Sequence, residues 1–525
     1  MRTATATHEQ VAPDRRRRLL ILGICSMSLL LVGLDATIVN VALPAIQRSL
    51  HSTLSGLQWT VDAYTVVLAS LLMLAGSTAD RLGRRRVFQA GLALFSLGSL
   101  LCALAPSLDL LVAFRVVQAM GGAMLSPVAM SIVRNVFEDP RERARAIGVF
   151  AAMFGISMAL GPVLGGFLVS AISWRAIFVV NLPFALAAIA LAALFVPESR
   201  APRPRRIDPV GQVLAIAALS TLTYAIIDGG RVGFGAVAIV ILLALALGSF
   251  VALVLYELRR REPLLEVRFF TSAPFAGASA IAVCLSAALG GFLFMNTLYL
   301  QDVRGLSPLQ TGLAMLPTAT MIVVFAPLSG RLMGRFGARP SMVAGGLAVT
   351  ASGLMLTGLA PGTSLPFLLA AYAVFGFGFA LVSPPIANTA VSGMPPAQAG
   401  VAAAVATTSR QVGITLGVAV FGAVAGSVQG AAIGPGFAQA TRPGWWIVAA
   451  LGLAVAALGY LTTTGWARDT ARRTAQRLEE RRAALIGPAV EGRVDRQGSG
   501  TLQCVTCASP PSTTSTATFP RWRPS

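Results

Sequence analysis

The stretch Leu34-Asp-Ala-Thr-Ile-Val-Asn-Val-Ala-Leu-Pro44 places one carboxylate, Asp35, in the outer part of an apolar run that begins at Leu19. The run follows Arg15-Arg16-Arg17-Arg18 and contains no other charged residue. A run of this length predicts a transmembrane helix. An acid inside such a helix costs about 2.5–3.5 kcal/mol on insertion scales, so Asp35 is expected to face a cavity or a polar partner. The alternative is that Asp35 only caps or braces the end of the helix.

The composition of the whole chain is that of a membrane protein. Of its 525 residues 55% are hydrophobic and 12% are charged, and the mean hydropathy is +0.74. A soluble protein carries about 25% charged residues. All 41 basic residues are arginine. Because a Walker-type phosphate loop requires Gly-Lys-Ser/Thr, the missing lysine excludes an ATPase of that kind. A gradient or a separate subunit must then supply the energy, and no cofactor is expected.

Apolar runs recur along most of the chain, and the short loops between them carry arginine. With the N-terminus taken as cytoplasmic, 34 arginines fall in inside segments, five fall in outside loops and two lie within runs. Basic loops stay on the cytoplasmic side, so this asymmetry predicts cytoplasmic N- and C-termini in a bacterial inner membrane, with an even number of spans. The fourteen predicted spans are 19–44, 57–79, 87–106, 108–132, 145–171, 175–196, 209–228, 233–256, 274–300, 309–330, 340–360, 365–390, 401–425 and 444–465.

Cysteine and histidine are too sparse for a metal centre. Cys504 and Cys507 form a lone Cys-x-x-Cys near the C-terminus, and their role stays open. A zinc site needs two further ligands nearby, and His8 and His51 do not supply them, so no metal is expected. The sequence also lacks a nucleophile–base pair, so the chain is not expected to be an enzyme. The basic loops follow membrane topology, so nucleic acid is not an expected partner.

Two charged breaks divide the runs into groups of six, two and six. Residues 197–208 are rich in Pro and Arg, and residues 257–273 form the second break. The Gly/Ser/Thr/Pro composition after residue 487 predicts disorder. The predicted organisation is a cytoplasmic head (1–18), a six-helix bundle (19–196), a linker with two extra transmembrane helices (197–273), a second six-helix bundle (274–465) and a cytoplasmic tail (466–525).

The two predicted bundles show an internal repeat. The segment from Gly76 to Arg86 aligns with the segment from Gly330 to Pro340 at an offset of 254 residues. Leu54-Ser-Gly-Leu-Gln58 aligns with Leu306-Ser-Pro-Leu-Gln310 at an offset of 252. Duplicated halves with a binding site between them are typical of secondary transporters.

Three charged residues are predicted at one depth in the outer half of the membrane. Asp35 lies about 24 Å along its helix from Leu19, and Arg115 and Asp62 lie about 10 Å and 8 Å below the outer surface. A proton that binds one acid would change how tightly Arg115 holds the other, which is a basis for proton coupling. Gln118 shares the helical face of Arg115 and joins this candidate cluster. The alternatives are an ion cluster that never titrates, an Asp62 in the headgroup zone, and a Gln118 that only bonds two helices.

The loop between the second and third runs combines glycines, one acid and several arginines. Glycine permits a tight turn, and Asp80 can cap a helix end or pair with an arginine. A breakable Asp–Arg contact at the cytoplasmic rim would stabilise one of two conformations, whereas the alternative is an ordinary basic loop. The candidate gating residues are Gly76, Asp80, Arg81, Gly83, Arg84 and Arg85.

The fifth run carries small residues at positions 157, 161 and 165, which predict a close-packing ridge. Pro162 removes a backbone hydrogen bond and is expected to bend the helix, as a hinge or seal between the halves. Plain packing is the alternative reading. The candidate hinge or packing residues are Gly161, Pro162, Gly165 and Gly166, and the second half carries a buried polar pair, Arg410 and Gln411.

Together these features resemble the major facilitator superfamily, in its fourteen-span drug:proton antiporter branch. The resemblance covers about residues 15–465, and its ordered set of motifs is specific although each alone is weak to moderate. The matching motifs are Leu34–Pro44 in span 1, Gly76–Arg86 in loop 2–3, Arg115-Val-Val-Gln118 in span 4, Gly161-Pro162-x-x-Gly165-Gly166 in span 5, Trp174–Pro183, and Gln301–Gly312.

The chain departs from the family pattern at three positions. Ala119 and Ser157 stand where the motifs usually have glycine, and both side chains are small enough to keep close packing. Gly334 replaces the counterpart of Asp80 in the second half, so the gating contact is expected on one side only.

The resemblance implies an all-α fold and proton-driven export of amphipathic, often cationic compounds by alternating access. It implicates the motif Arg115–Gln118 in proton transfer and implies no cofactor. Asp35 would be the principal coupling or cation-sensing carboxylate, with Arg115 as its positive partner. The first alternative is a dedicated exporter of one self-made metabolite, such as an antibiotic, a siderophore or a lipid. The second is a transport-dead membrane sensor or scaffold that uses its long tail. The sequence identifies neither the substrate nor any accessory subunit.

Overall fold

The computed structural model describes residues 14–201, 207–260, 263–392, 394, 398–428 and 437–486. Its regular elements within these ranges are all helical. Most of the predicted head, part of the first charged break and the tail with Cys504 and Cys507 lie outside the described residues. The described residues up to Arg477 belong to one compact unit, and those from Leu478 belong to a second.

The first helix set covers the first six predicted spans. Short polar residues begin its helices: Asp14, Thr53 and Ser107 accept a backbone N–H at the starts of three of them. Such caps satisfy donors that have no partner inside the helix. The run 175–196 divides at Val180 into a short and a long helix. The members are α1 (Arg15–Leu50), α2 (Leu54–Leu82), α3 (Arg84–Leu104), α4 (Leu108–Val136), α5 (Pro140–Ala171), α6 (Ala176–Val179) and α7 (Asn181–Phe195).

The two predicted extra spans form a helical pair, α8 (Pro209–Val232) and α9 (Val237–Arg259). These helices pack on each other, and α8 also packs on α2 and on α15 (Ala399–Val428). A short 3-10 turn, η1 (Val267–Thr271), precedes the second helix set.

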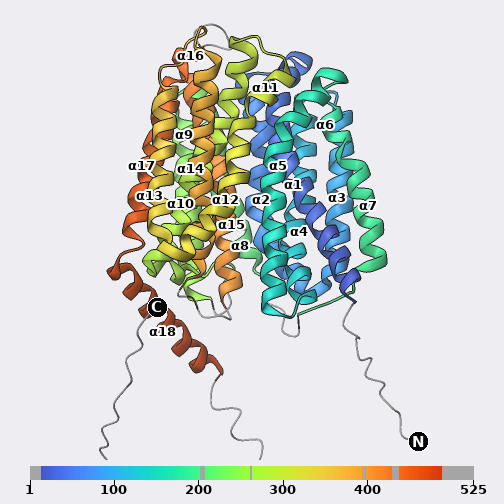
Figure 1. Ribbon diagram of the computed structural model, residues 1–525, viewed down its shortest axis with the longest axis vertical. Coiled ribbons are helices and arrows are strands. Elements are labelled where there is room, and N and C mark those ends of the chain that lie inside the picture. Colours follow the sequence, from blue (N-terminus) through green and yellow to red (C-terminus); the bar gives the residue numbers. More distant parts are fainter. Residues whose placement is uncertain are drawn as a thin grey trace, which may run out of the picture. The chain divides into compact units, whose positions relative to one another are not determined.

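The second helix set follows, and its run 309–330 divides at Met315. Figure 1 shows α10, α13, α14 and α17 on one side of the molecule and α1, α3, α4 and α7 on the other. The members of the second helix set are α10 (Ala273–Leu298), the π-turn η2 (Tyr299–Val303), α11 (Pro308–Ala314), α12 (Leu316–Phe336), α13 (Ala338–Leu356), α14 (Leu365–Val391), α15, α16 (Phe437–Ala440) and α17 (Arg442–Leu461). A basic helix, α18 (Gly465–Ile486), comes last.

Thirteen helical segments of the described chain are long and apolar enough to cross a membrane. The predicted span 340–360 is the exception. It forms α13, whose first turn carries Arg339, Pro340 and Ser341 and is therefore less apolar. This helix of 19 residues still packs against α14 and α17 within the second set.

The predicted repeat has a structural counterpart. Gly83 ends α2 with φ +114° and Gly337 ends α12 with φ +78°, and the next helix follows directly in both places. Glycine suits both positions because a side chain is strained at such φ values. The two glycines are 254 residues apart, as the sequence alignment requires.

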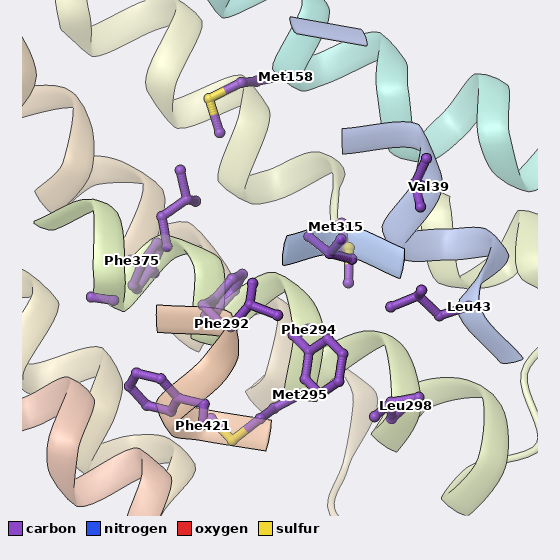
Figure 2. Packing of buried hydrophobic residues seen from close by; sticks show 14 of the residues in the cluster. Val39, Leu43, Met158, Phe292, Phe294, Met295, Leu298, Met315, Phe375 and Phe421 are labelled. Atoms are coloured by element: carbon purple, nitrogen blue, oxygen red, sulfur yellow. The ribbon is translucent and has the colours of Figure 1, made fainter. Parts of the chain in front are cut away.

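A large buried apolar cluster joins the two helix sets. It contains Val39 and Leu43 from α1, Met158 from α5, and Phe292 and Phe375 from the second set. Figure 2 shows these side chains together with Met315. The sets also meet where α5 packs on α11 and α12, and where α2 packs on α15.

Candidate functional site

A buried ion pair joins α1 and α4 inside the first helix set. Arg115 Nη1 lies 2.5 Å from Asp35 Oδ2, and the exposed fractions of the two side chains are 1% and 0%. Gln118 lies one turn further along α4, and its Nε2 donates to Asp35 Oδ1 at 2.8 Å. The structure thus brings together the acid, the arginine and the amide that the sequence placed in one cluster.

Two further polar residues complete the surroundings of Asp35. Asn181 Nδ2 donates to Asp35 Oδ1 at 3.2 Å and lies 3.1 Å from Ser99 Oγ. Gln118 Nε2 also lies 3.2 Å from the Ser99 hydroxyl. Asp35 therefore accepts from one guanidinium and two amides, all of them buried. Such a complete set of donors offsets the cost of burying a charge.

Arg115 has acceptors other than Asp35. Its Nη1 lies 2.7 Å from Gln118 Oε1, and its Nε donates to the carbonyl of Thr60 at 3.2 Å. Its guanidinium carbon lies 4.1 Å from the centre of the Tyr64 ring, a cation–π contact. Arg115 therefore has polar and aromatic partners on α2 and α4 in addition to Asp35.

Asp62 does not join this cluster, contrary to the sequence prediction. It is fully buried, and the hydrogen bond of its side chain is with Thr65 Oγ1 at 3.4 Å. The residues of α2 that touch Arg115 are Thr60 and Tyr64, which are four apart and share a face. Asp62 is two residues from each and points away from that face. The depth argument was therefore insufficient, because it ignored rotation about the helix axis.

The sequence analysis did not select Asn181, Ser99 or Tyr64 as site residues. Asn181 carried a usable signal, since it is an uncharged polar residue in an otherwise apolar run and lay within a motif of the family resemblance. Ser99 and Tyr64 carried none that distinguishes them from other Ser and Tyr residues in the spans.

The loop between α2 and α3 holds a second group of charges. Arg84 Nη2 lies 3.0 Å from Asp80 Oδ1, and the two side chains are partly exposed. A third member, Glu198, comes from the segment after α7. Its carboxylate accepts from the backbone N–H of Arg85 at 3.2 Å and lies 3.7 Å from Arg86 Nε. We name Asp80, Arg84, Arg86 and Glu198 the rim cluster. The sequence analysis selected Asp80 and Arg84 but not Glu198.

The glycines of this loop differ in their surroundings. A Cβ on Gly83 would lie 2.6 Å from Glu198 Oε1, so glycine at this position lets the segment after α7 approach closely. Gly76 lies within α2, and its nearest neighbour is Pro127, with ordinary contact at 3.9 Å. Arg85 donates to the carbonyl of Val196 at 3.4 Å, and Arg81 is exposed.

The glycines of α5 pack against two different partners. A Cβ on Gly161 or Gly165 would collide with Thr37 or Ile38 of α1, within the first helix set. A Cβ on Gly166 would lie 2.4 Å from the carbonyl of Pro308, which begins α11 in the second set. Pro162 lies inside α5, and its carbonyl faces Gly312 of α11.

A small cavity lies where α1 and α5 meet α10, α12 and Met315, the residue that precedes α12. Phe292 and Met315 supply part of its wall from the second set, and Met158 supplies part from α5. Figure 2 shows these three side chains. None of the ten residues around it is charged, and Thr37 and Thr318 are its hydroxyl side chains. The full lining is Thr37, Met158, Pro162, Leu289, Phe292, Leu293, Met315, Thr318, Ala319 and Ile322.

Arg410 and Gln411 lie on α15, and both side chains are half-buried. The backbone carbonyl of Gln411 lies 3.1 Å from the Thr415 hydroxyl. In the part of the chain that the structure describes, no three His, Cys, Asp or Glu side chains are placed to hold a metal ion.

Residues 25–418 match the family model described as Major Facilitator Superfamily. The chain belongs to this superfamily, whose members are transporters rather than enzymes. With its membrane-spanning helices and bacterial relatives, it is a multi-pass protein of the bacterial inner membrane.

Curated relatives are named for drug resistance or export. "Multidrug resistance protein Stp" of Mycobacterium tuberculosis is 37% identical over 420 residues, which cover 80% of this chain and 78% of the relative. "Tetracenomycin C resistance and export protein" of Streptomyces glaucescens is 35% identical over 398 residues, covering 76% and 74%. A crystal structure of a bacterial homolog of the human lysosomal transporter Spinster shares the fold, with a TM-score of 0.60, 18% identity, and coverage of 88% of this chain and 99% of that one.

Proposed function

We propose that the protein is a proton-driven exporter of amphipathic compounds that works by alternating access. The observation that carries this proposal is the buried Asp35–Arg115 pair in a chain whose relatives are named for drug resistance or export. An ionisable pair inside a membrane is costly and usually serves ion or substrate movement.

The coupling step follows from the contacts of Arg115. A proton that binds Asp35 removes the negative charge and so weakens the attraction to Arg115. Arg115 then relies on Gln118, the Thr60 carbonyl and the Tyr64 ring. Because these partners lie on α2 and α4, protonation would loosen α1 from the two helices that hold the arginine.

The rim cluster and α5 would carry this local change to the two faces of the membrane. Asp80, Arg81, Gly83, Arg84 and Arg85 would form the cytoplasmic gate with Glu198, and Gly76 would belong to the same motif. Gly161 and Gly165 would let α5 slide on α1, while Gly166 and Pro162 would form a seal against α11. Arg410 and Gln411 would be the polar pair of the second half.

We assign the chain to the fourteen-span drug:proton antiporter branch. In this assignment α13 also crosses the membrane, which brings the thirteen candidate spans to fourteen, and both termini lie in the cytoplasm. The packing of α13 between α14 and α17 supports the span count. The excess of arginine in the inside segments supports the orientation. The predicted head, bundles, linker and tail are retained in this assignment, with the helical pair α8–α9 as the extra spans.

The apolar lining of this small cavity, with two hydroxyl side chains, supports a substrate that has both apolar and polar parts. Met158, Met315 and Phe292 are adaptable or flat apolar groups, which suit varied apolar shapes. Cationic charge in the substrate remains part of the proposal. A panel of matched neutral and cationic dyes would test it.

A dedicated exporter of one metabolite is the second candidate. The relative from Streptomyces glaucescens is named for a single compound, tetracenomycin C, whereas Stp is named for multidrug resistance. Export of one compound, with no transport of a chemically varied panel, would favour the dedicated role.

The decisive experiment uses purified protein in lipid vesicles with an imposed pH gradient and a panel of dyes. We expect dye movement that depends on the gradient and that Asp35→Asn abolishes. The matched control is Asp228→Asn, since Asp228 pairs with Arg231 in a partly exposed site on α8. Normal transport by Asp35→Asn would overturn the coupling role. Deletion of residues 487–525 should leave transport intact, and a scaffold would instead fail in its cellular role.

A further inference from the structure

The basic helix α18 begins at Gly465, four residues after α17 ends at Leu461, and it continues from that end of α17 (Figure 1). Because α17 is one of the candidate membrane spans, the first turns of α18 lie next to a surface of the bilayer. Tyr460 and Trp466, on either side of the junction, are 53% and 65% exposed. Exposed Tyr and Trp rings at the end of a span are typical of the boundary between lipid and water.

One side of α18 is fixed against the second helix set. Thr470 Oγ1 accepts from the backbone N–H of Ala273, the first residue of α10, at 3.0 Å. One turn further along α18, the hydroxyls of Thr474 and Thr271 lie 3.1 Å apart. Ala467 lies on the same side and is fully buried. These contacts hold the helix at the end of the bundle and leave its basic residues exposed.

The exposed arginines of α18 do not all lie on one side. Residues 465–477 carry four arginines and one aspartate, a net formal charge of +3. At about 100° per residue, Arg473 and Arg477 lie within about 20° of Trp466 around the helix axis. We name these three residues the tryptophan face. It combines an exposed aromatic ring with two cations.

The other two arginines, Arg468 and Arg472, lie about 120–160° away from the tryptophan face around the axis. Asp469 Oδ1 is 3.9 Å from Arg472 Nη1, so this second side carries the one acid of the segment as well. Among the ion pairs of the described residues, none includes Arg473 or Arg477. The two sides therefore have equal numbers of arginines but different surroundings.

We propose that the tryptophan face binds the headgroups of anionic phospholipids in the adjacent surface of the bilayer. The Trp466 ring lies at the level of the headgroups, and Arg473 and Arg477 pair with lipid phosphates. A guanidinium suits this role because its planar N–H groups form bidentate hydrogen bonds with phosphate. A bilayer fits better than a soluble acidic partner, because Trp466 comes five residues after a membrane-spanning helix and basic segments at this place bind anionic lipid surfaces. The inference goes beyond the proposed transport function and does not depend on it.

The test measures which lipids surround α18 in the full-length protein. A donor dye is attached to Gln476→Cys, an exposed position on α18, after the five native cysteines are changed to Ala. The vesicles contain phosphatidylcholine and phosphatidylglycerol in equal parts, with a trace of one of the two lipids carrying an acceptor dye on its acyl chain. The ratio of energy transfer to the two labelled lipids gives the enrichment of the anionic lipid beside α18.

We expect phosphatidylglycerol to be enriched by about fivefold or more, the factor that one arginine near an anionic surface supplies. Arg473→Gln/Arg477→Gln should abolish the enrichment, and high salt should reduce it because the attraction is electrostatic. Arg473→Lys/Arg477→Lys should retain it, since the charge is kept. The matched control is Arg468→Gln/Arg472→Gln, which removes the same number of charges from the other side and should retain most of the enrichment.

Three results would overturn the proposal. Equal energy transfer to the two lipids in the protein with all four arginines would leave α18 to a soluble acidic partner. Enrichment that persists in Arg473→Gln/Arg477→Gln would exclude these two arginines as the lipid ligands. Equal losses in the two glutamine variants would show that net charge attracts the lipid and that the tryptophan face has no special part. None of these measurements requires transport, so the exporter and the lipid site stand or fall separately.

Discussion

The protein buries two aspartates in its first helix set, and their surroundings differ. Asp35 receives a guanidinium and two amides from three neighbouring residues, Arg115, Gln118 and Asn181. Asp62 has a long contact with Thr65 and an oxygen without a partner. The first acid is held within one set of helices, and the second lies at the contact between the two sets. The same residue type at similar depth is therefore a paired charge in one place and an isolated acid in the other.

The first prediction concerns Asp35, the aspartate with the larger number of hydrogen-bond donors, and removes its cationic partner. Arg115→Met should destabilise the protein by about 3–5 kcal/mol, because it leaves the buried Asp35 carboxylate without its cation. The measurement is the thermal unfolding midpoint of the purified protein, together with its yield from membranes. The control is the double variant Asp35→Asn/Arg115→Met, which should regain most of the lost stability but transport nothing. A single variant as stable as the wild type would show that Asp35 does not depend on Arg115.

The second prediction compares two glycines at close helix contacts, Gly98 beside Gln118 and Gly422 beside Gln58. A Cβ on Gly98 would lie 2.4 Å from the backbone nitrogen of Gln118, beside Asp35, whereas a Cβ on Gly422 would meet the end of the Gln58 side chain. Helix backbone cannot move aside as a side chain can, so Gly98→Ala should cost about 1–3 kcal/mol and Gly422→Ala less. Thermal unfolding midpoints measure both. Gly334→Ala is the control, since no atom lies within 4 Å of its Cβ. The reverse order of Gly98 and Gly422 would contradict the packing described.

The third prediction sharpens the difference between the two acids. Asp62→Asn should change stability at neutral pH by about 1 kcal/mol or less, because no charged partner loses a contact. Asp35→Asn should reduce it more, since the buried Arg115 then loses its counter-ion. Unfolding midpoints of the two variants, measured side by side, give the comparison. Equal losses would mean that Asp62 has an ionic partner.

The smallest effect is expected in the rim cluster, where the charges are partly solvated. Glu198→Gln should cost about 0.5 kcal/mol or less, because its partner Arg86 is 68% exposed and water screens the pair. Any loss should shrink further in high salt. Unfolding midpoints at low and high salt measure this, with Glu142→Gln as a control on the Arg18–Glu142 pair. A salt-independent loss as large as that of Arg115→Met would place Glu198 in a buried network.

Much of the fold was predictable because it depends on local pattern. Every predicted apolar run forms a helix, and the repeat predicted the matching turns at Gly83 and Gly337. The contact of Asp35 with Arg115 and Gln118 was also predictable, since the depth of a residue along a membrane-spanning helix follows from residue counting. The same counting failed for Asp62, because depth does not give direction around the helix. Glu198 was not predicted, because it contacts Arg85 only where the segment after α7 folds back against the start of α3, more than a hundred residues away in the chain.

The sequence by itself determined the membrane class, the runs that become helices and the identity of the charges buried in them. These properties follow from hydrophobicity and from the cost of placing a charge in lipid, which act on each segment locally. Only the tertiary structure decided that Asn181 and Ser99 complete the surroundings of Asp35 and that Asp62 faces α15. Partners are chosen by the rotation and packing of whole helices, and the sequence of one helix does not contain that information.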